Sequence, residues 1–170
     1  MKILNTISLT LLFSFVLFAS QGLAQSTTVN AEGTVLAPLE VSGTNLNFGA
    51  EIFPGLDEAV APTDAGAAQF DISGEAGKDI EATFTLPTEM TDGTNNLTLT
   101  FSGTDAGHAT ANTDQGTATE FDPNGTLTTA LEATSGELFI WLGGTVEPAA
   151  DQAAGTYTAD ITLDTVYVGN

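Results

Sequence analysis

The sequence predicts an all-β fold, an antiparallel sandwich of about eight or nine strands. Beyond an apolar N-terminal run, no long segment shows helical periodicity. Short stretches that alternate apolar and polar residues instead recur between clusters of Gly, Pro, Asn and Asp, which is typical of β-sandwiches. The 146 residues of 25–170 suit a single domain with its own core.

Residues 1–24 are predicted to be a cleavable signal peptide. Lys2 supplies a positive start, residues 7–19 are almost wholly apolar, and Gly22 and Ala24 are the small residues that precede a cleavage site. The apolar run is shorter than the roughly 20 residues of a membrane span. We therefore expect an exported protein, in the periplasm, at the cell surface or outside the cell, with no membrane insertion after cleavage. Because it lacks cysteine, packing and strand pairing must hold it together.

The N-terminal half is predicted to supply five strands. Residues 34–42, which contain Pro38, and residues 46–48 form the first pair, and residues 69–72 form a short strand. Residues 54–68 are expected to be irregular. In residues 80–86 and 97–101 the apolar side chains share one parity, so we expect two neighbouring antiparallel strands joined by a loop.

The C-terminal half begins with a polar, glycine-rich stretch. Residues 104–125 are predicted to be a long surface loop that holds His108 in solvent, with a short strand around Phe121. Residues 127–131 form a strand, and the unbroken apolar run 138–142 predicts a strand covered on both faces, with Trp141 in the core. The two glycines that follow, Gly143 and Gly144, predict a sharp bend.

Residues 157–168 are the clearest alternating stretch. As one strand they would span about 40 Å at roughly 3.3 Å per residue. Their apolar parity predicts a core-facing side, with Asp160 and Asp164 facing outward. We expect this last strand to close its own domain.

The charge is strongly acidic. The chain has 22 acidic residues against two basic ones, a net charge of −20, and only Lys78 remains after residue 24. Such a surface repels phosphate backbones and anionic lipids, so nucleic acid is excluded as a partner. Cations and basic protein surfaces are better partners, although solubility in a salty exterior explains the same composition.

No catalytic residue is predicted. His108 is the only histidine, and the chain lacks cysteine and arginine and has no G-x-S-x-G motif, so we expect no enzyme and no cofactor. Calcium is the candidate metal, since it prefers oxygen ligands from Asp, Asn and backbone carbonyls. Ordinary turn chemistry explains the same residues. The candidate ligands are Asp122 and Asn124, Asp92 and Asn95 with Asn96, and Asp105 with Asp114.

Three stretches together resemble a bacterial exported family known as domain-of-unknown-function family 4402. They are residues 34–55, with Leu46-Asn47-Phe48-Gly49, residues 70–87, and residues 143–167, where Gln152-Ala153-Ala154-Gly155-Thr156-Tyr157 opens the final strand. That family is similar in turn to pilin-like proteins of the spore coat protein U and archaic chaperone-usher type. The resemblance implies an immunoglobulin-like β-sandwich at or outside the cell surface. Gly155 and Tyr167 stand where such pilins carry a glycine and an aromatic residue around the last strand.

The expected function is that of a non-catalytic, pilin-like structural or interaction protein, which pairs with a protein partner or with itself through a sheet edge. Donation of a strand requires a spare segment ahead of the first strand. If the first strand begins near Thr34, residues 25–32 are short for that role. The alternative function is a secreted calcium- or carbohydrate-binding β-sandwich module, which would use the stretches 104–125 and 54–68.

Overall fold

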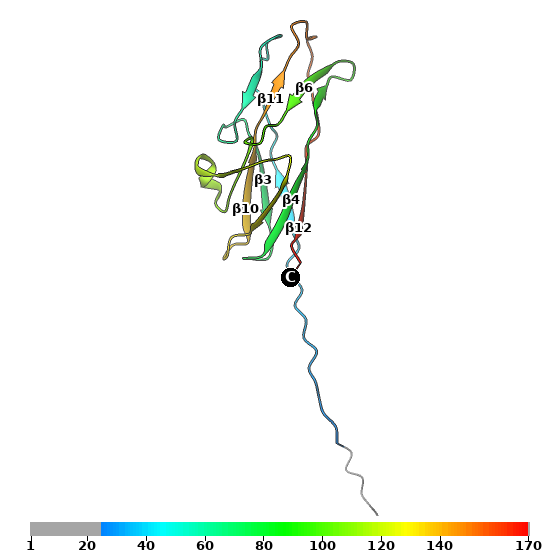
Figure 1. Cartoon of the computed structure of the whole chain (residues 1–170), viewed down its shortest axis with the longest axis vertical. Helices are drawn as coiled ribbons and strands as arrows, with labels where there is room; N and C mark the ends of the chain where they lie inside the picture. Colours follow the sequence, from blue (N-terminus) through cyan, green and yellow to red (C-terminus); the bar gives the residue numbers. More distant parts are fainter. Residues whose placement is uncertain (1–24, 170) are drawn as a thin grey trace, which may run out of the picture. The chain divides into compact units, whose positions relative to one another are not determined.

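The computed structural model describes residues 25–169, and these are nearly all β (Figure 1). The chain divides into two units at Thr34 and Val35, and residues 25–34 contain no helix or strand. The predicted signal peptide lies outside the described residues, among which no helix is long and apolar enough to cross a membrane. The elements are β1 (Glu40–Gly43), β2 (Glu58–Val60), β3 (Ala68–Ser73), β4 (Asp79–Thr85), β5 (Glu89–Thr91), β6 (Asn96–Thr100), β7 (Ala106–Ala109), the 3-10 helix η1 (Asn112–Thr117), β8 (Thr119–Phe121), β9 (Thr126–Ala130), β10 (Glu137–Leu142), β11 (Gly144–Glu147) and β12 (Thr162–Tyr167).

The strands form three antiparallel sheets, with the orders β1-β3-β10-β7-β8, β2-β11-β6-β5 and β12-β4-β9. In Figure 1, β3 lies beside β10 and β4 beside β12. One core cluster joins the first sheet, through Ile72 and Ile140, to the third, through Ile80, Phe84 and Leu127. The prediction of an all-β antiparallel sandwich is confirmed. The described residues contain more strands than expected because β2 and β5 are too short to give a clear alternating pattern.

β10 is covered on both faces, as its unbroken apolar run predicts. Ile140 belongs to one core cluster and Trp141 to the other, and both side chains are buried. Trp141 also donates a hydrogen bond from Nε1 to Oε1 of Gln69 (3.2 Å). At Gly143 the chain passes from the first sheet to β11 in the second, and a Cβ there would collide with the carbonyl oxygen of Val60. The close approach requires glycine.

The strand predicted at residues 34–42 is confirmed only for residues 40–42, and the strand predicted at residues 46–48 is wrong. β1 begins only at Glu40, because the backbone of Ala37 bonds to side chains and not to a sheet: its N–H donates to Glu75 (3.1 Å) and its carbonyl accepts from Tyr167 (2.8 Å). Residues 46–48 form no strand, although the Asn47 N–H bonds to the carbonyl of Gly66.

The predicted pairing of residues 80–86 with residues 97–101 is also wrong. β4 pairs with β9 and β12, whereas β6 pairs with β5 and β11. β5 forms a hairpin with β6 through a turn in which Asp92 Oδ1 accepts hydrogen bonds from the N–H groups of Thr94 (2.8 Å) and Asn95 (2.7 Å). This local turn places β5, and not β4, beside β6.

Residues 104–125 are not one loop, since they contain β7, η1 and β8. His108 lies in β7 opposite Ile140, is partly buried, and its ring stands edge-on to Phe121 with the centroids 5.9 Å apart. Its expected place in a solvent-exposed loop is therefore wrong. Small residues suit this part of the sheet, because Ala106 is buried opposite Leu142 and a Cβ at Gly107 would lie 3.1 Å from Ala118.

Candidate functional site

A cleft opens between the ends of β1 and β12. One side is the chain that continues from β1, which is held to its neighbour by Thr44 N–H to Gln69 O (2.8 Å). The other side is residues 157–161, which precede β12 and are held by two bonds between the backbones of Thr158 and Thr91 (2.9 and 3.0 Å). No strand of the described residues spans the gap. We call this space the β1–β12 cleft.

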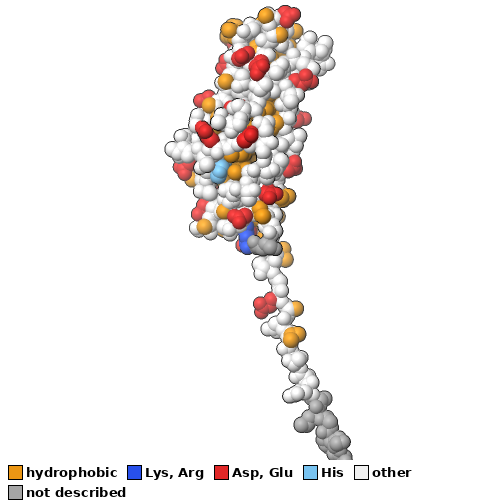
Figure 2. Space-filling view, viewed as in Figure 1, with side chains coloured by type: hydrophobic (Ala, Val, Ile, Leu, Met, Phe, Trp, Pro, Cys, Tyr) orange, Lys and Arg blue, Asp and Glu red, His pale blue; other side chains and the backbone are white. Residues whose placement is uncertain are grey.

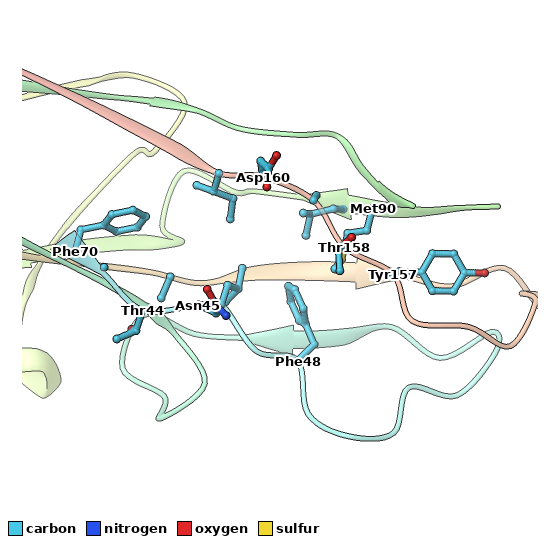
Figure 3. A pocket seen from close by; sticks show the side chains of 14 residues that line it. Thr44, Asn45, Phe48, Phe70, Met90, Tyr157, Thr158 and Asp160 are labelled. Atoms are coloured by element: carbon cyan, nitrogen blue, oxygen red, sulfur yellow. The ribbon is translucent and has the colours of Figure 1, made fainter. Parts of the chain in front are cut away.

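The cleft has a volume of about 520 Å³ and an apolar floor. Figure 3 shows Phe70 toward one end of the cleft and Tyr157 toward the other, with Phe48, Met90 and Thr158 between them. Phe48 and Leu99 also belong to the buried core, so the floor of the cleft is the core itself. Its lining residues are Gly43, Thr44, Asn45, Leu46, Phe48, Ala68, Phe70, Met90, Leu99, Tyr157, Thr158, Ala159, Asp160 and Ile161.

The core is incompletely covered along this side of the molecule. Leu127 on β9 and Leu163 on β12 both flank β4 and face the core, yet Leu127 is 8% exposed whereas Leu163 is only partly buried. On the facing edge, Val41 of β1 is 41% exposed although its register partner Ile72 is buried. The sandwich is thus closed on the β9 side and open between β1 and β12.

The free edge of β12 carries unpaired backbone groups. Within residues 25–169, β12 pairs only with β4, in the register Tyr167↔Ile80, and the N–H of Val168 donates to the carbonyl of Asp79 (3.0 Å). Because backbone groups alternate in direction along a strand, residues 162, 164 and 166 also bond toward β4. The N–H and C=O groups of residues 163, 165 and 167 therefore face the open edge.

The Tyr167 hydroxyl fixes the point where the chain enters the domain. It accepts a hydrogen bond from the Glu75 N–H (2.6 Å) and donates one to the Ala37 carbonyl (2.8 Å). A Cβ at Gly74 would lie 2.5 Å from this hydroxyl, so glycine is needed beside it. Residues 25–36 belong to no strand, and Val35 is 94% exposed.

The sequence matches a family model described as a domain of unknown function, DUF4402, over residues 6–167. The chain belongs to the DUF4402 family. None of the curated proteins compared with the DUF4402 chain matches it. The resemblance noted from the sequence is confirmed at this level.

The candidate calcium ligands of the DUF4402 domain lie in two separate turns. Asp92 and Asn95 join β5 to β6 before Asn96, while Asn124 bonds through Nδ2 to the carbonyl of Phe101, just past Thr100. The two turns therefore lie at opposite ends of β6, and the six residue steps from Asn95 to Phe101 span about 20 Å at roughly 3.3 Å per residue. The structure does not bring the two pairs together.

Within each turn the carboxylate is already bonded to N–H groups. Asp92 Oδ2 accepts from Asn95 Nδ2 (2.9 Å), and Asp122 Oδ1 accepts from both the backbone N–H (2.9 Å) and Nδ2 (3.0 Å) of Asn124. These bonds stabilise the ionised form, so they lower the pKa of Asp92, chiefly through the Asn95 side chain, and that of Asp122, chiefly through the Asn124 backbone. Both arrangements are those of hydrogen-bonded Asx turns.

The other acidic candidates are also apart. Asp105 accepts from the Ser102 N–H (2.7 Å) in the turn before β7, and Asp114 lies in η1 with Thr113 as its partner. Among residues 25–169 no three His, Asp or Glu side chains gather closely enough to hold a metal ion.

Sequence reasoning missed the residues that line the cleft. Phe48 and Phe70 look like ordinary core residues, because their exposure to the cleft depends on strands that are distant in sequence. One available signal was the length of residues 157–168, of which only residues 162–167 form β12. The expectation that this strand closes its own domain is not met on its outer side, since β12 is an edge strand.

Proposed function

We propose that this DUF4402 domain is a non-catalytic structural protein of pilin-like type, exported to the periplasm or cell surface, whose copies assemble by β-strand addition. The observation that carries the proposal is the β1–β12 cleft, where an apolar floor and a free backbone edge lie side by side. An extended segment gains main-chain hydrogen bonds from such an edge, and alternate side chains fill the groove.

The N-terminal segment of a second copy is the proposed occupant. Val29, Ala31, Gly33 and Val35 share one parity and alternate with Thr28, Asn30, Glu32 and Thr34. Val29 is 84% and Val35 94% exposed, so each has apolar surface to bury. Donation of residues 27–35 would place the apolar parity on the cleft floor and the polar parity in solvent.

The available length supports donation. Since β1 begins at Glu40 and Ala37 is held by Tyr167 and Glu75, residues 25–36 are free to extend. These twelve residues reach about 40 Å when extended, and residues 157–167 of the acceptor span about 36 Å at roughly 3.3 Å per residue. Residues 25–32 alone would be short for donation, but that limit applies only if the first strand begins near Thr34, whereas β1 begins at Glu40.

Cysteine cross-linking tests the proposal directly, because the chain contains no cysteine. A chain with Val29→Cys mixed with a chain carrying Ile161→Cys should form an intermolecular disulfide, whereas Asn30→Cys, on the opposite parity, should form far less. Size-exclusion chromatography and electron microscopy should show oligomers or filaments. In a chain that carries both Val29→Cys and Ile161→Cys, a cross-link only within single chains would indicate self-insertion. Monomers without a cross-link in either experiment would contradict strand addition altogether.

Charge placement gives a second test. Val29→Asp with Val35→Asp would put carboxylates on the apolar floor and should abolish assembly. Asn30→Asp with Thr34→Asp adds the same charge to the solvent-facing parity and should leave assembly largely intact. Equal effects of the two double variants would argue against insertion of this segment.

A further inference from the structure

A second apolar surface lies at the end of the domain where β5 meets the connections β1–β2 and β11–β12. Phe53 is 60% and Leu56 64% exposed, although both are large hydrophobic side chains. Phe53 borders a cavity of about 560 Å³, whose floor includes Leu97 and Met90. We call Ile52, Phe53, Leu56, Met90 and Tyr157 the Phe53 patch.

The exposure of Phe53 and Leu56 is built into a fixed turn. The Leu56 N–H donates to the Phe53 carbonyl (3.1 Å), and the Gly55 N–H donates to the carbonyl of Pro148 in the neighbouring connection (3.1 Å). Gly55 has a φ of +76°, which favours glycine, and a Cβ there would lie 3.4 Å from Ala150. The turn therefore holds two apolar side chains outward at a fixed position, which is typical of interaction surfaces.

The charges around the patch select its partner. Three exposed acidic residues adjoin the apolar residues: Glu51, Asp57 and Asp151. The one Lys or Arg among the described residues, Lys78, lies outside the patch, directly before β4. Figure 2 shows acidic side chains over the whole visible face of the domain. An apolar centre with an acidic rim attracts an apolar side chain flanked by basic residues.

We propose that the Phe53 patch binds a segment of another protein in which apolar side chains are flanked by Lys or Arg. A second copy of this chain is a poor occupant, because it offers 22 acidic residues and no cation in residues 25–36. The Phe53 patch and the β1–β12 cleft therefore bind different partners, even though Met90 and Tyr157 border both spaces. It would dock the assembled protein onto a basic partner.

Binding of three synthetic peptides to residues 25–170, followed by NMR of the protein, tests the proposal. One has Leu-Phe between two pairs of Lys, one has Leu-Phe between two pairs of Glu, and one has Ser-Ser between two pairs of Lys. Only the first should shift the amide signals of residues 51–57 and 148–157 in a saturable way, and added NaCl should weaken its binding. Equal binding of both lysine peptides, or no saturable binding of the first, would overturn the proposal.

Phe53→Ser with Leu56→Ser should weaken binding of the first peptide by about tenfold or more. Val41→Ser is the matched control, since Val41 is also exposed but lies away from the patch in β1. Melting curves check that each variant is folded; retained binding in the folded double variant would contradict the proposal. The Val29→Asp, Val35→Asp chain should bind the peptide as wild type does, which separates the patch from strand addition.

Discussion

Tyr167 shows how one side chain near the C-terminus sets where the unpaired N-terminal segment, residues 25–36, ends and the domain begins. Its hydroxyl joins Ala37 to Glu75, and the Glu75 carboxylate bonds to the Ala37 N–H in turn. Two of these hydrogen bonds end on Ala37, and the third joins Glu75 to Tyr167, the two residues that hold it. Residues 25–36, which precede Ala37, belong to no strand. The residue at which the chain joins the domain is therefore fixed by hydrogen bonds to side chains and not by pairing of backbone strands.

Tyr167→Phe should destabilise the domain by about 1–2 kcal/mol, roughly 1 kcal/mol for each of the two lost hydrogen bonds. The loss should be local, so hydrogen exchange should speed up most at the amides of Ala37 and Glu75. Urea unfolding measures the first effect and exchange by NMR the second. Unchanged exchange at Glu75 would show that the hydroxyl does not hold this junction.

Gly143→Ala should destabilise the domain by about 1–3 kcal/mol, the usual cost of overpacking, because the new Cβ would meet the backbone carbonyl of Val60. Gly116→Ala is the matched control, since nothing lies within 4 Å of a Cβ at that position. Thermal unfolding of both variants measures the difference. Similar midpoints for the two would contradict the close crossing between β10 and β2.

His108 should make stability depend on pH. Burial lowers its pKa below the ordinary value of 6.5, so the unfolded chain binds more protons than the folded one just below that pH. The contribution of neutral His108 is full above pH 6.5 and is lost as pH falls through that value toward the lower folded pKa.

Urea unfolding from about pH 7.5 to about pH 5 should therefore show decreasing stability in wild type and a flatter profile in His108→Gln. Since His108 is the only histidine, the variant isolates its titration. Asp92, Asp122 and Glu132, whose pKa values are lowered by hydrogen bonds from neighbouring N–H groups, contribute stability that is lost only at more acidic pH. An identical slope in the variant would contradict burial of the imidazole.

At the scale of elements, the two sides of β12 differ in what their backbone groups meet. The N–H of Asp164 faces β4, and the N–H of Thr165 faces the open edge. A proline at either position removes one donor, but only the first donor takes part in the β4–β12 ladder.

Thr165→Pro should keep the fold and impair assembly, because strand addition needs the edge donor. Asp164→Pro should be less stable than Thr165→Pro by about 1–3 kcal/mol, the cost of leaving a ladder partner unsatisfied. Circular dichroism with urea measures stability, and size-exclusion chromatography measures assembly. Assembly that is unaffected in folded Thr165→Pro would place the partner away from β12.

Two predicted strands are confirmed within one residue at each end, whereas only residues 162–167 of the most clearly alternating stretch, residues 157–168, form a strand. Residues 80–86 became β4 with its alternate residues buried, and residues 127–131 became β9. The prediction of strands failed where hydrogen bonds to residues distant in the sequence override the conformation that the local sequence favours. Residues 34–39 were predicted to belong to a strand, yet Tyr167 and Glu75 bond to the backbone groups of Ala37. Conversely, β7 forms from a polar, glycine-rich stretch because β10 pairs with it.

At the scale of the whole molecule, the net charge of −20 opposes both folding and assembly through self-repulsion. Raising NaCl from about 0.01 M to about 0.5 M shortens the screening length from about 30 Å to below 8 Å. The melting temperature and the rate of assembly should both rise over this range. Sucrose at equal osmolality is the control for solute exclusion, and a salt-independent assembly rate would indicate that acidic repulsion does not limit the encounter of copies.

Composition and local alternation by themselves determined the acidic, disulfide-free character of the chain and its all-β class, because these properties follow from residue types and short-range periodicity. The resemblance of three sequence stretches indicated its family, and the family model confirms it. Only the tertiary structure decided that β1 and β12 lie at edges with a cleft between them, that the calcium candidates occupy opposite ends of β6, and that Phe53 and Leu56 remain exposed. Each of these depends on which distant strands pair, because a side chain is buried only where another strand covers it.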